Sequence, residues 1–314
     1  MAAGYESLEA WRRYLPFVPE RFRFHDDQAP REEWWSWRGA TIHLDLYEVE
    51  NPPATVLLLH GGGGYGRMLF PLAVALQRMG YRVVAPDLPG YGLSRVRRNQ
   101  IDYRVWVDCA SELLQEESKR TGKPVVPFGL SMGGYLGYLV AARTREAGAL
   151  IATTLCDPRS PKVIDDFSVN AFVGRVMLPI SRHTLRWASG LRLPIRWFSK
   201  MKAIANDEKL VEVICNDPLG GGARPPLGFL LSIFEVRPDL EPEDFGLCPV
   251  LFMHPTEDHW TSLDASKEFF DRLASKDKEF ALLEGCGHFP LEEPGITQLE
   301  HQVQRFLDRL FRRH

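Results

Sequence analysis

The sequence predicts an α/β fold built on a mostly parallel central sheet, with a long helical insertion late in the chain. Short apolar runs begin near residues 55, 82, 125, 149, 249 and 279, and stretches of helical character separate them. Alternating strands and helices are typical of a parallel sheet whose faces are covered by helices. About ninety residues lie between the run 149–155 and the run that begins at 249, far more than one crossover helix needs.

The same pattern divides the chain into three parts. We expect an N-terminal extension at residues 1–32, a core at 33–157 and 246–314, and a helical cap inserted at 158–245. A strand hairpin over residues 34–49 should begin the core, because apolar side chains alternate there at Ile42, Leu44 and Leu46. Within the cap, Gly220–Gly222 is expected to be a loop or a hinge.

The N-terminal extension has its own pattern of apolar residues. Four of them recur at helical spacing, namely Tyr5, Leu8, Trp11 and Leu15. Proline cannot donate the N–H that a helix interior needs, so Pro16 and Pro19 should end this helix. We expect one short helix that lies across the body or against a second copy, with membrane contact as a minor alternative.

Composition and charge are those of one globular enzyme. The 314 residues carry a net charge of −3 with a pI near 6.3, so nucleic acid is not expected as a partner. The first ten residues lack a basic-then-apolar signal pattern, and no run reaches the roughly 18 apolar residues of a membrane span. The five cysteines are scattered without metal-ligand spacing and indicate reduced thiols. We therefore expect a cytoplasmic protein without a metal or a cofactor, and its oligomeric state stays open.

A glycine-serine-glycine pattern lies where one predicted strand passes into a helix. Gly129, Ser131 and Gly133 follow the apolar run 124–128, and a helix is predicted over residues 132–144. A sharp strand-to-helix turn needs residues without bulk two positions before and after the serine, because the strained backbone brings them close to their neighbours. The pattern predicts a nucleophile elbow that exposes the Ser131 hydroxyl for acyl transfer.

A glycine-rich turn after an earlier strand supplies a second part of such a site. The run 55–59 leads into His60 and then Gly61–Gly64. In the elbow arrangement one oxyanion donor is the amide after the serine, here Met132, and the other comes from this early turn, where we choose Gly62. Phosphate binding is the alternative for four glycines, but the lysine and hydroxyl of a P-loop are missing.

Two later strand ends supply a candidate acid and a candidate base, in the chain order serine, acid, histidine. Asp258 and His288 each lie just past a predicted strand, and glycines flank the loop of His288. In a triad with Ser131, His288 would take the serine proton, and Asp258 would fix the histidine tautomer. Glu257 and Asp157 stay open as alternatives for the acid, because both also lie on loops that follow strands.

Other residues of these loops have a simpler interpretation. We expect His60 to be a structural histidine beneath the glycine-rich turn. His254 and His259 lie beside the acid and are expected to point elsewhere. Cys286 lies two residues before His288 but lacks an elbow, so it is not favoured as a nucleophile.

Together these motifs resemble the α/β-hydrolase superfamily, and within it the lysophospholipase and monoacylglycerol-lipase-like branch. That branch carries a His-Gly turn, an Asp-x-x-Gly-x-Gly-x-Ser stretch, Gly-x-Ser-Met-Gly-Gly and a closing Gly-His. The corresponding segments here are 60–61, 87–94, 129–134 and 287–288. The resemblance covers roughly residues 40–157 and 246–312. Ser131 disfavours the haloalkane dehalogenases and epoxide hydrolases, which use an aspartate nucleophile.

The expected activity is hydrolysis of carboxylic esters through an acyl-enzyme at Ser131, with hydrophobic or lipid-like monoacyl esters favoured. Two alternatives stay open. Carbon–carbon bond hydrolases use the same triad and also tolerate Ser-Met-Gly-Gly. A non-catalytic binding protein can share the fold, because a fold by itself does not establish an activity.

The predicted cap contains a basic and aromatic segment that has no acidic residue from Arg175 to Asn206. Its basic residues are Arg175, Arg182, Arg186, Arg192, Arg196, Lys200 and Lys202. Four apolar residues recur every three positions and predict one apolar helical face, namely Ile195, Phe198, Met201 and Ile204. Packing of this helix on the core, peripheral contact with anionic lipid and attraction of an acidic substrate all stay open.

Overall fold

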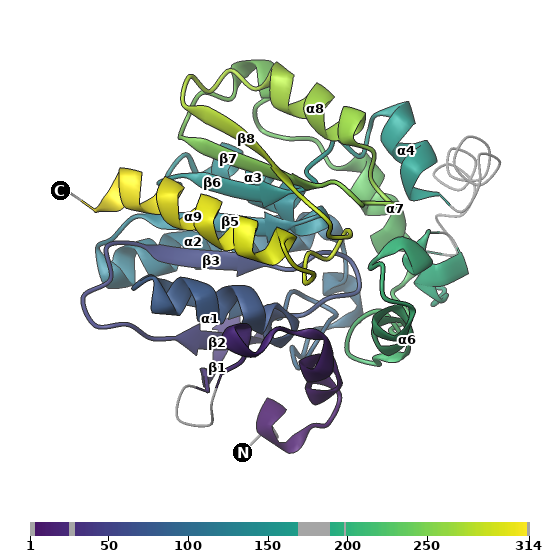
Figure 1. Ribbon diagram of the computed structural model, residues 1–314. Helices are drawn as coiled ribbons and strands as arrows, with labels where there is room; N and C mark the ends of the chain where they lie inside the picture. Colours follow the sequence, from purple (N-terminus) through teal and green to yellow (C-terminus); the bar gives the residue numbers. More distant parts are fainter. Residues whose placement is uncertain (1–3, 25–28, 169–188, 198, 313–314) are drawn as a thin grey trace.

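The computed structural model describes residues 4–24, 29–168, 189–197 and 199–312, and the statements below concern these residues. They form one eight-stranded sheet in the order β1-β2-β4-β3-β5-β6-β7-β8 (Figure 1). The strands are β1 (Arg31–Trp37), β2 (Ala40–Tyr47), β3 (Thr55–Leu59), β4 (Arg82–Pro86), β5 (Val125–Leu130), β6 (Leu150–Thr153), β7 (Val250–Pro255) and β8 (Lys278–Leu283). β2 pairs antiparallel with β1 and β4, and every other pairing is parallel.

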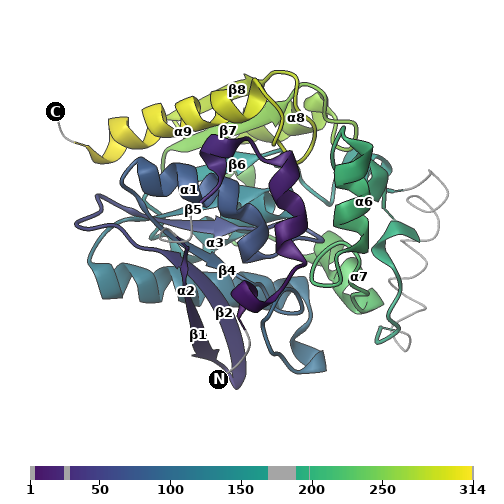
Figure 2. The same cartoon turned by 60° about the horizontal axis from the view of Figure 1, so that its bottom comes forward.

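Helices cover both faces of this sheet. The helices of the core are α1 (Phe70–Arg78), α2 (Tyr103–Thr121), α3 (Met132–Thr144), α8 (Leu263–Arg272) and α9 (Gly295–Phe311). α1 and α9 pack together on one face, and α2 and α3 pack together on the other (Figures 1 and 2). The predicted α/β-hydrolase fold is confirmed, and α3 has the bounds that the sequence predicts.

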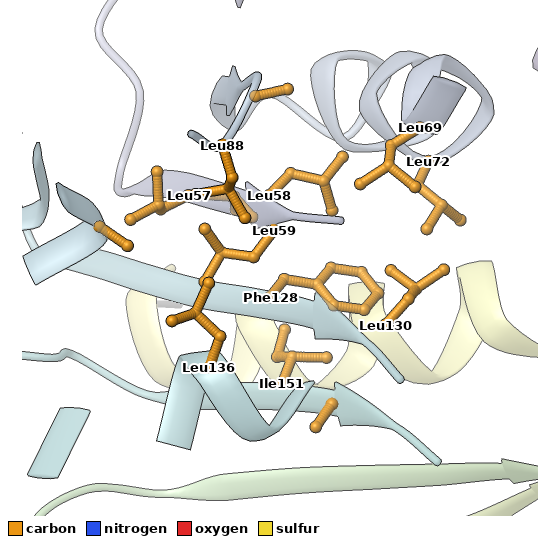
Figure 3. Packing of buried hydrophobic residues seen from close by; sticks show 14 of the residues in the cluster. Leu57, Leu58, Leu59, Leu69, Leu72, Leu88, Phe128, Leu130, Leu136 and Ile151 are labelled. Carbon is orange, nitrogen blue, oxygen red and sulfur yellow. The ribbon is translucent and has the colours of Figure 1, made fainter. Parts of the chain in front are cut away.

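The centre of the core lies where β3 and β5 pair. All residues of both strands are buried, and Leu57, Leu59, Phe128 and Ile151 pack between the helix layers (Figure 3). Burial on both faces explains why these strands appear in the sequence as unbroken apolar runs rather than alternating ones. The hairpin of β1 and β2 lies at the sheet edge. Ile42, Leu44 and Leu46 are buried, and the polar residues between them, His43 and Asp45, are buried as well.

The prediction of one N-terminal helix is wrong. The N-terminal segment, residues 4–24, forms three short 3₁₀ helices: η1 (Tyr5–Ser7), η2 (Trp11–Phe17) and η3 (Glu20–Phe22). Pro16 lies inside η2 rather than ending it. The segment packs against the rest of the chain through buried Tyr5, Trp11 and Tyr14. Short 3₁₀ turns suit such a segment because its conformation is set by the surface beneath it rather than by its own helix propensity.

The insertion between β6 and β7, residues 158–245, is helical in its described part. Its elements are α4 (Pro161–Phe167), η9 (Ile195–Trp197), η10 (Met201–Ala203), α6 (Glu208–Asn216), α7 (Leu227–Glu235) and η11 (Pro242–Asp244). None of the helices in the described part of the chain is long and apolar enough to span a bilayer.

The predicted continuous apolar helix in this insertion is also wrong. Two separate 3₁₀ turns, η9 and η10, stand in its place, although Ile195, Met201 and Ile204 are buried as expected. A spacing of three residues matches the three-residue turn of a 3₁₀ helix better than the 3.6-residue turn of an α-helix. Phe198, Arg175, Arg182 and Arg186 lie outside the described residues.

Candidate active site

Ser131 occupies a strained turn between β5 and α3. Its backbone has φ +55° and ψ −122°, and its amide donates a hydrogen bond of 3.0 Å to the Thr153 carbonyl of the neighbouring strand. A Cβ added to Gly129 would lie 1.9 Å from the carbonyl oxygen of Gly133, and one added to Gly133 would lie 2.2 Å from the carbonyl oxygen of Leu59. Both glycines are therefore required by close backbone contact, and the turn has the geometry of a nucleophile elbow.

Asp258 and His288 meet across two loops at the same edge of the sheet. Asp258 follows β7, His288 follows β8, and Nδ1 of His288 lies 2.8 Å from Oδ2 of Asp258. Oδ1 of Asp258 accepts hydrogen bonds from the backbone amides of Trp260 (2.8 Å) and Thr261 (2.9 Å). Backbone amides therefore hold Oδ1 of Asp258 in place, and Oδ2 faces the imidazole of His288.

The electrostatic surroundings favour the ionised form of Asp258. Burial by itself would raise its pKa, but the charge of His288, the hydrogen bond to His288 and the two backbone donors lower it below its ordinary value. An ionised Asp258 accepts a hydrogen bond from the Nδ1–H group of His288, which keeps the proton on Nδ1 and leaves Nε2 as the basic nitrogen. In the described structure this Nε2 is buried and has no hydrogen-bond partner, so it is available to a hydroxyl in the cavity.

The alternative acids and histidines have other surroundings. Glu257 is exposed, and Asp157 pairs with Arg159 at 2.7 Å. His259 is exposed, and His254 is bonded through Nδ1 to the Ser266 hydroxyl at 3.0 Å. These environments favour Asp258 as the partner of His288.

Cys286 is a buried thiol rather than a second nucleophile. Burial raises its pKa to about 12, so the thiol stays protonated at neutral pH. None of the five cysteines, all of which lie in the described residues, forms a disulfide. A reducing compartment such as the cytoplasm remains a prediction.

The glycine-rich turn, residues 60–64 and called the oxyanion turn below, lies directly against the elbow. A Cβ added to Gly61 would lie 3.4 Å from Cβ of Ser131 and 3.6 Å from the amide nitrogen of Met132. One added to Gly62 would lie 2.8 Å from the Met132 sulfur. Gly62 and Met132 are therefore neighbours, as the choice of both as oxyanion donors requires.

His60 holds the oxyanion turn from below. It is fully buried, Nε2 accepts a hydrogen bond from the Leu88 amide at 3.0 Å, and Nδ1 therefore donates to the Gly61 carbonyl at 2.8 Å. Burial lowers its pKa to about 4, so the imidazole is neutral and able to accept that amide proton. The geometry matches the structural role expected of this histidine.

A cavity of about 100 Å³ brings the predicted residues together. Ser131, Met132, Gly62 and His288 all line it. Apolar residues of the insertion complete the wall, among them Val163, Phe167, Ile195, Ile214, Ile233 and Phe234. A pocket of this composition suits the apolar part of a ligand, with the polar groups gathered at one end.

Two residues that line the cavity were not predicted from the sequence, Trp260 and Asp166. The ring of Trp260 packs 5.0 Å from the ring of His288 and shields the pair with Asp258. Asp166 of α4 also lines the cavity, and its Oδ2 accepts hydrogen bonds from the amide (3.1 Å) and hydroxyl (2.7 Å) of Ser262. Trp260 could have been found from its position two residues after the acid. Asp166 had no local signal, because only the fold brings α4 to the cavity.

A group of acidic and histidine side chains elsewhere does not fit a metal. Ligand atoms of Glu32, His43 and Asp45 lie within 4.8 Å of one another. Arg67, however, forms ion pairs with Asp45 at 2.6 Å and with Glu32 at 3.3 Å. Burial lowers the pKa of His43, but the carboxylate of Asp87, 3.2 Å from Nδ1, and the hydrogen bond to Glu32 raise it to about 10 overall, so the imidazole is protonated and cannot ligate a cation.

The fold and the elbow define the α/β-hydrolase class of enzymes. The chain belongs to the serine aminopeptidase S33 family, whose model matches residues 50–295. It is similar to the phospholipase YtpA of Bacillus subtilis (strain 168), with 22% identity over 278 residues that cover 87% of this chain and 98% of that protein. It is also similar to the monoglyceride lipase of Saccharomyces cerevisiae, with 23% identity over 301 residues that cover 90% and 94% of the two chains.

A solved structure shows the same architecture. A soluble variant of the monoglyceride lipase from Saccharomyces cerevisiae, in complex with a substrate analog, superposes with a TM-score of 0.76 and 19% identity over 94% of this chain and 99% of that one. At this identity the likeness shows the fold. The family and its lipase relatives place the chain among the carboxylic ester hydrolases of lipase-like type, as the sequence motifs predict.

Proposed function

We propose that the protein hydrolyses neutral, hydrophobic monoacyl esters with Ser131, His288 and Asp258 as a catalytic triad. The observation that carries this proposal is the buried Asp258–His288 pair, whose His288 lines the same apolar cavity as the elbow serine. An activated hydroxyl next to oriented backbone amides is what acyl transfer requires. The lipase relatives support an ester as the substrate.

The proposed mechanism has two halves. His288 Nε2 takes the Ser131 proton as the hydroxyl oxygen attacks the ester carbonyl, and it then gives this proton to the leaving alcohol. In the second half the same nitrogen deprotonates a water molecule, which attacks the acyl carbon. The bond from that carbon to Ser131 Oγ breaks, Nε2 returns the proton to Oγ, and the carboxylic acid leaves. Amides of Gly62 and Met132 would stabilise the oxyanion in each half, while Asp258 holds the imidazole and stabilises its charged form.

The charge of the cavity favours neutral substrates over anionic ones. Asp166 is the one Asp, Glu, Lys or Arg side chain among the described residues that line the cavity. A phosphate or carboxylate near it would lose its hydration without gaining a cation. We therefore favour neutral monoacyl esters over the acidic substrates that the basic residues of the insertion suggested.

The insertion would act as a cap that shields the ester from bulk water. Its α4, η9, α6 and α7 all contribute side chains to the cavity wall. Exclusion of water strengthens the interaction of the oriented amides with the developing negative charge.

The proposal is tested with a panel of substrates presented to the purified protein. We expect turnover of uncharged monoacylglycerols and simple aryl esters, with kcat/KM at least roughly tenfold higher than for a lysophospholipid or dicarboxylate monoester of equal acyl length, because about 1.4 kcal/mol of charge repulsion gives this ratio. Vinylogous diketones serve as the contrasting substrates. Exclusive turnover of the diketones would replace the proposal with carbon–carbon bond hydrolysis, and no turnover of any substrate would favour a binding protein.

Peripheral contact with anionic lipid is a separate part of the proposal. Two large apolar side chains of the insertion are exposed, Leu191 (52%) and Trp197 (59%), and Arg192 and Lys202 near them in the chain are exposed as well. Exposed apolar residues beside basic ones are typical of interfacial membrane contact. Of the other basic residues predicted to take part, Lys200 donates to the Asp165 carbonyl at 3.4 Å, and the Arg196 side chain lies outside the described residues.

We expect the double variant Arg192→Gln with Lys202→Gln to bind phosphatidylserine-containing vesicles roughly tenfold or more weakly than wild type at low salt. Raised salt should shrink the difference, because screening acts on exposed charges. Vesicle sedimentation measures the effect. Lys119→Gln with Lys123→Gln, which removes two exposed charges near the end of α2, is the matched control. Equal loss in both double variants would show that only net charge matters.

A further inference from the structure

The N-terminal segment reaches the insertion through one buried carboxylate. Figure 2 shows the segment, in purple, passing in front of α1 and beside α6. The Tyr14 hydroxyl of η2 donates to Oδ2 of Asp217, just past α6, at 2.9 Å. The Tyr65 hydroxyl of the core donates to the same oxygen at 2.8 Å. All three side chains are buried, so three separate parts of the chain meet at this atom.

Asp217 organises the turn that follows it. Its Oδ1 accepts a hydrogen bond from the Leu219 amide at 2.9 Å. Its backbone carbonyl accepts bonds from the amides of Gly220 (3.1 Å) and Gly222 (2.8 Å). This Asp217 turn, residues 217–223, contains the glycines that the sequence marks as a loop or a hinge. Its shape depends on where the Asp217 side chain is held.

The Asp217 turn lies directly on the oxyanion turn. A Cβ added to Gly220 would lie 2.5 Å from the carbonyl oxygen of Gly63, and one added to Gly63 would lie 3.1 Å from Cα of Gly221. The closest contacts between the two turns are made by backbone atoms, which cannot change rotamer to absorb a shift. The Leu219 carbonyl also accepts a hydrogen bond of 3.1 Å from the Gly92 amide, which attaches the turn to the core. A shift of the Asp217 turn would therefore be transmitted to the residue after Gly62.

We propose that Tyr14 is a positioning residue for the reaction, which acts through Asp217 and its turn to hold the oxyanion turn, and with it the Gly62 amide, in place. This inference rests on the proposed function, because it gives Gly62 a role in ester hydrolysis. Tyr14 lies outside residues 50–295, which match the family model. The contact that holds the Asp217 turn therefore comes from a segment that the family model does not include.

The Tyr14 hydroxyl contributes a hydrogen bond to a buried carboxylate in addition to the packing of its ring. Burial and the charge of Asp217 raise the pKa of Tyr14 far above its ordinary value, so the hydroxyl remains a donor at every working pH. A buried carboxylate that loses one of two hydroxyl donors is left under-bonded and tends to move toward another partner. The Tyr5 ring, also of the N-terminal segment, stacks on the Tyr65 ring at 5.4 Å and limits how far Tyr65 can compensate.

The test compares Tyr14→Phe with Tyr81→Phe in the full chain. The Tyr81 hydroxyl donates to Asp308 at 2.9 Å. Tyr81 directly precedes β4, so it lies at the amino ends of the parallel strands, opposite to the carboxyl ends that carry the site, and its variant loses a tyrosine–aspartate bond far from the site. We expect Tyr14→Phe to lower kcat on a neutral monoacyl ester about tenfold with KM within about twofold, since sub-ångström misplacement of a reacting group is enough for such a loss. Tyr81→Phe should keep the wild-type kcat.

Hydrogen–deuterium exchange supplies a readout that does not depend on turnover. Peptides that contain the oxyanion turn should exchange faster in Tyr14→Phe than in wild type or in Tyr81→Phe. A wild-type kcat in Tyr14→Phe would overturn the inference, and so would unchanged exchange in the oxyanion turn. If Tyr14→Phe fails to fold, Tyr65→Phe removes the other donor to Asp217 and is judged by the same criteria. Wild-type protein that hydrolyses no ester would overturn the proposed function instead, and the exchange comparison would still decide whether Tyr14 holds the turn.

Discussion

Replacement of Ser131 by alanine is expected to abolish ester hydrolysis while the protein stays folded. The loss should be roughly three to six orders of magnitude in kcat, because the variant lacks the hydroxyl on which the acyl-enzyme is proposed to form. The backbone at position 131 should tolerate the change, since alanine keeps the Cβ and removes only the hydroxyl oxygen. The backbone amide and carbonyl of Ser131 make its hydrogen bonds to Thr153, Gly134 and Tyr135, and alanine retains both groups.

Labelling with a fluorophosphonate ester, followed by digestion and mass spectrometry, tests directly whether Ser131 is the nucleophile. Wild type should carry one adduct at Ser131, and Ser131→Ala should carry none. Ser7→Ala removes an exposed hydroxyl at the N-terminal segment and should label like wild type. Turnover by Ser131→Ala, or an adduct on another residue of wild type, would contradict the assignment of the nucleophile.

Substitution of Asp258 by asparagine is expected to lower kcat by about four orders of magnitude. An amide at this position would donate to Nδ1 of His288 rather than accept from it, so the ring proton would move to Nε2. His288 could then no longer take the Ser131 proton. Because the pKa of Asp258 is lowered, its carboxylate stays ionised throughout the neutral range, and the wild-type acid limb of a pH–rate profile should not arise from Asp258.

The two alternative acids provide the controls for this experiment. Glu257→Gln changes an exposed carboxylate and should leave kcat within about twofold of wild type. Asp157→Asn disrupts the pair with Arg159 and should lower thermal stability more than kcat of the folded protein. Steady-state kinetics on one neutral ester, with thermal unfolding of each variant, separates these results. Near-normal turnover by Asp258→Asn would give the acid role to whichever control variant lost activity.

Ser131, Asp258 and His288 could be predicted as site residues because each is marked by residues close to it in the sequence. The elbow needs glycines two positions on either side of Ser131, and the structure shows the close backbone contacts that require them. Asp258 and His288 follow apolar strands, and parallel strands bring their carboxyl ends to one edge of the sheet. Position in the chain therefore implied proximity in space, and the pair at 2.8 Å agrees with that inference.

Two local predictions failed because tertiary packing overrode the periodicity. Tyr5, Leu8, Trp11 and Leu15 have helical spacing, yet the N-terminal segment breaks into 3₁₀ turns that bury Tyr14 and leave Leu15 partly exposed. This segment has little internal stability, so the surface that it covers decides its shape. The three-residue spacing around Met201 was likewise an indication of 3₁₀ turns rather than of one amphipathic helix.

The sequence by itself therefore determined the strand order along the chain, the elbow at Ser131 and the residues that could serve as acid and base, because these depend on local chemistry and on the rule that parallel strands end at one edge. Only the tertiary structure decided that Asp166 lines the cavity and that Tyr14, Tyr65 and Asp217 share one hydrogen-bonded centre. Tyr14 and Asp217 are 203 positions apart. Contacts across such a separation depend on how the insertion and the N-terminal segment pack on the core. Neither segment has a periodic pattern from which that packing could be predicted.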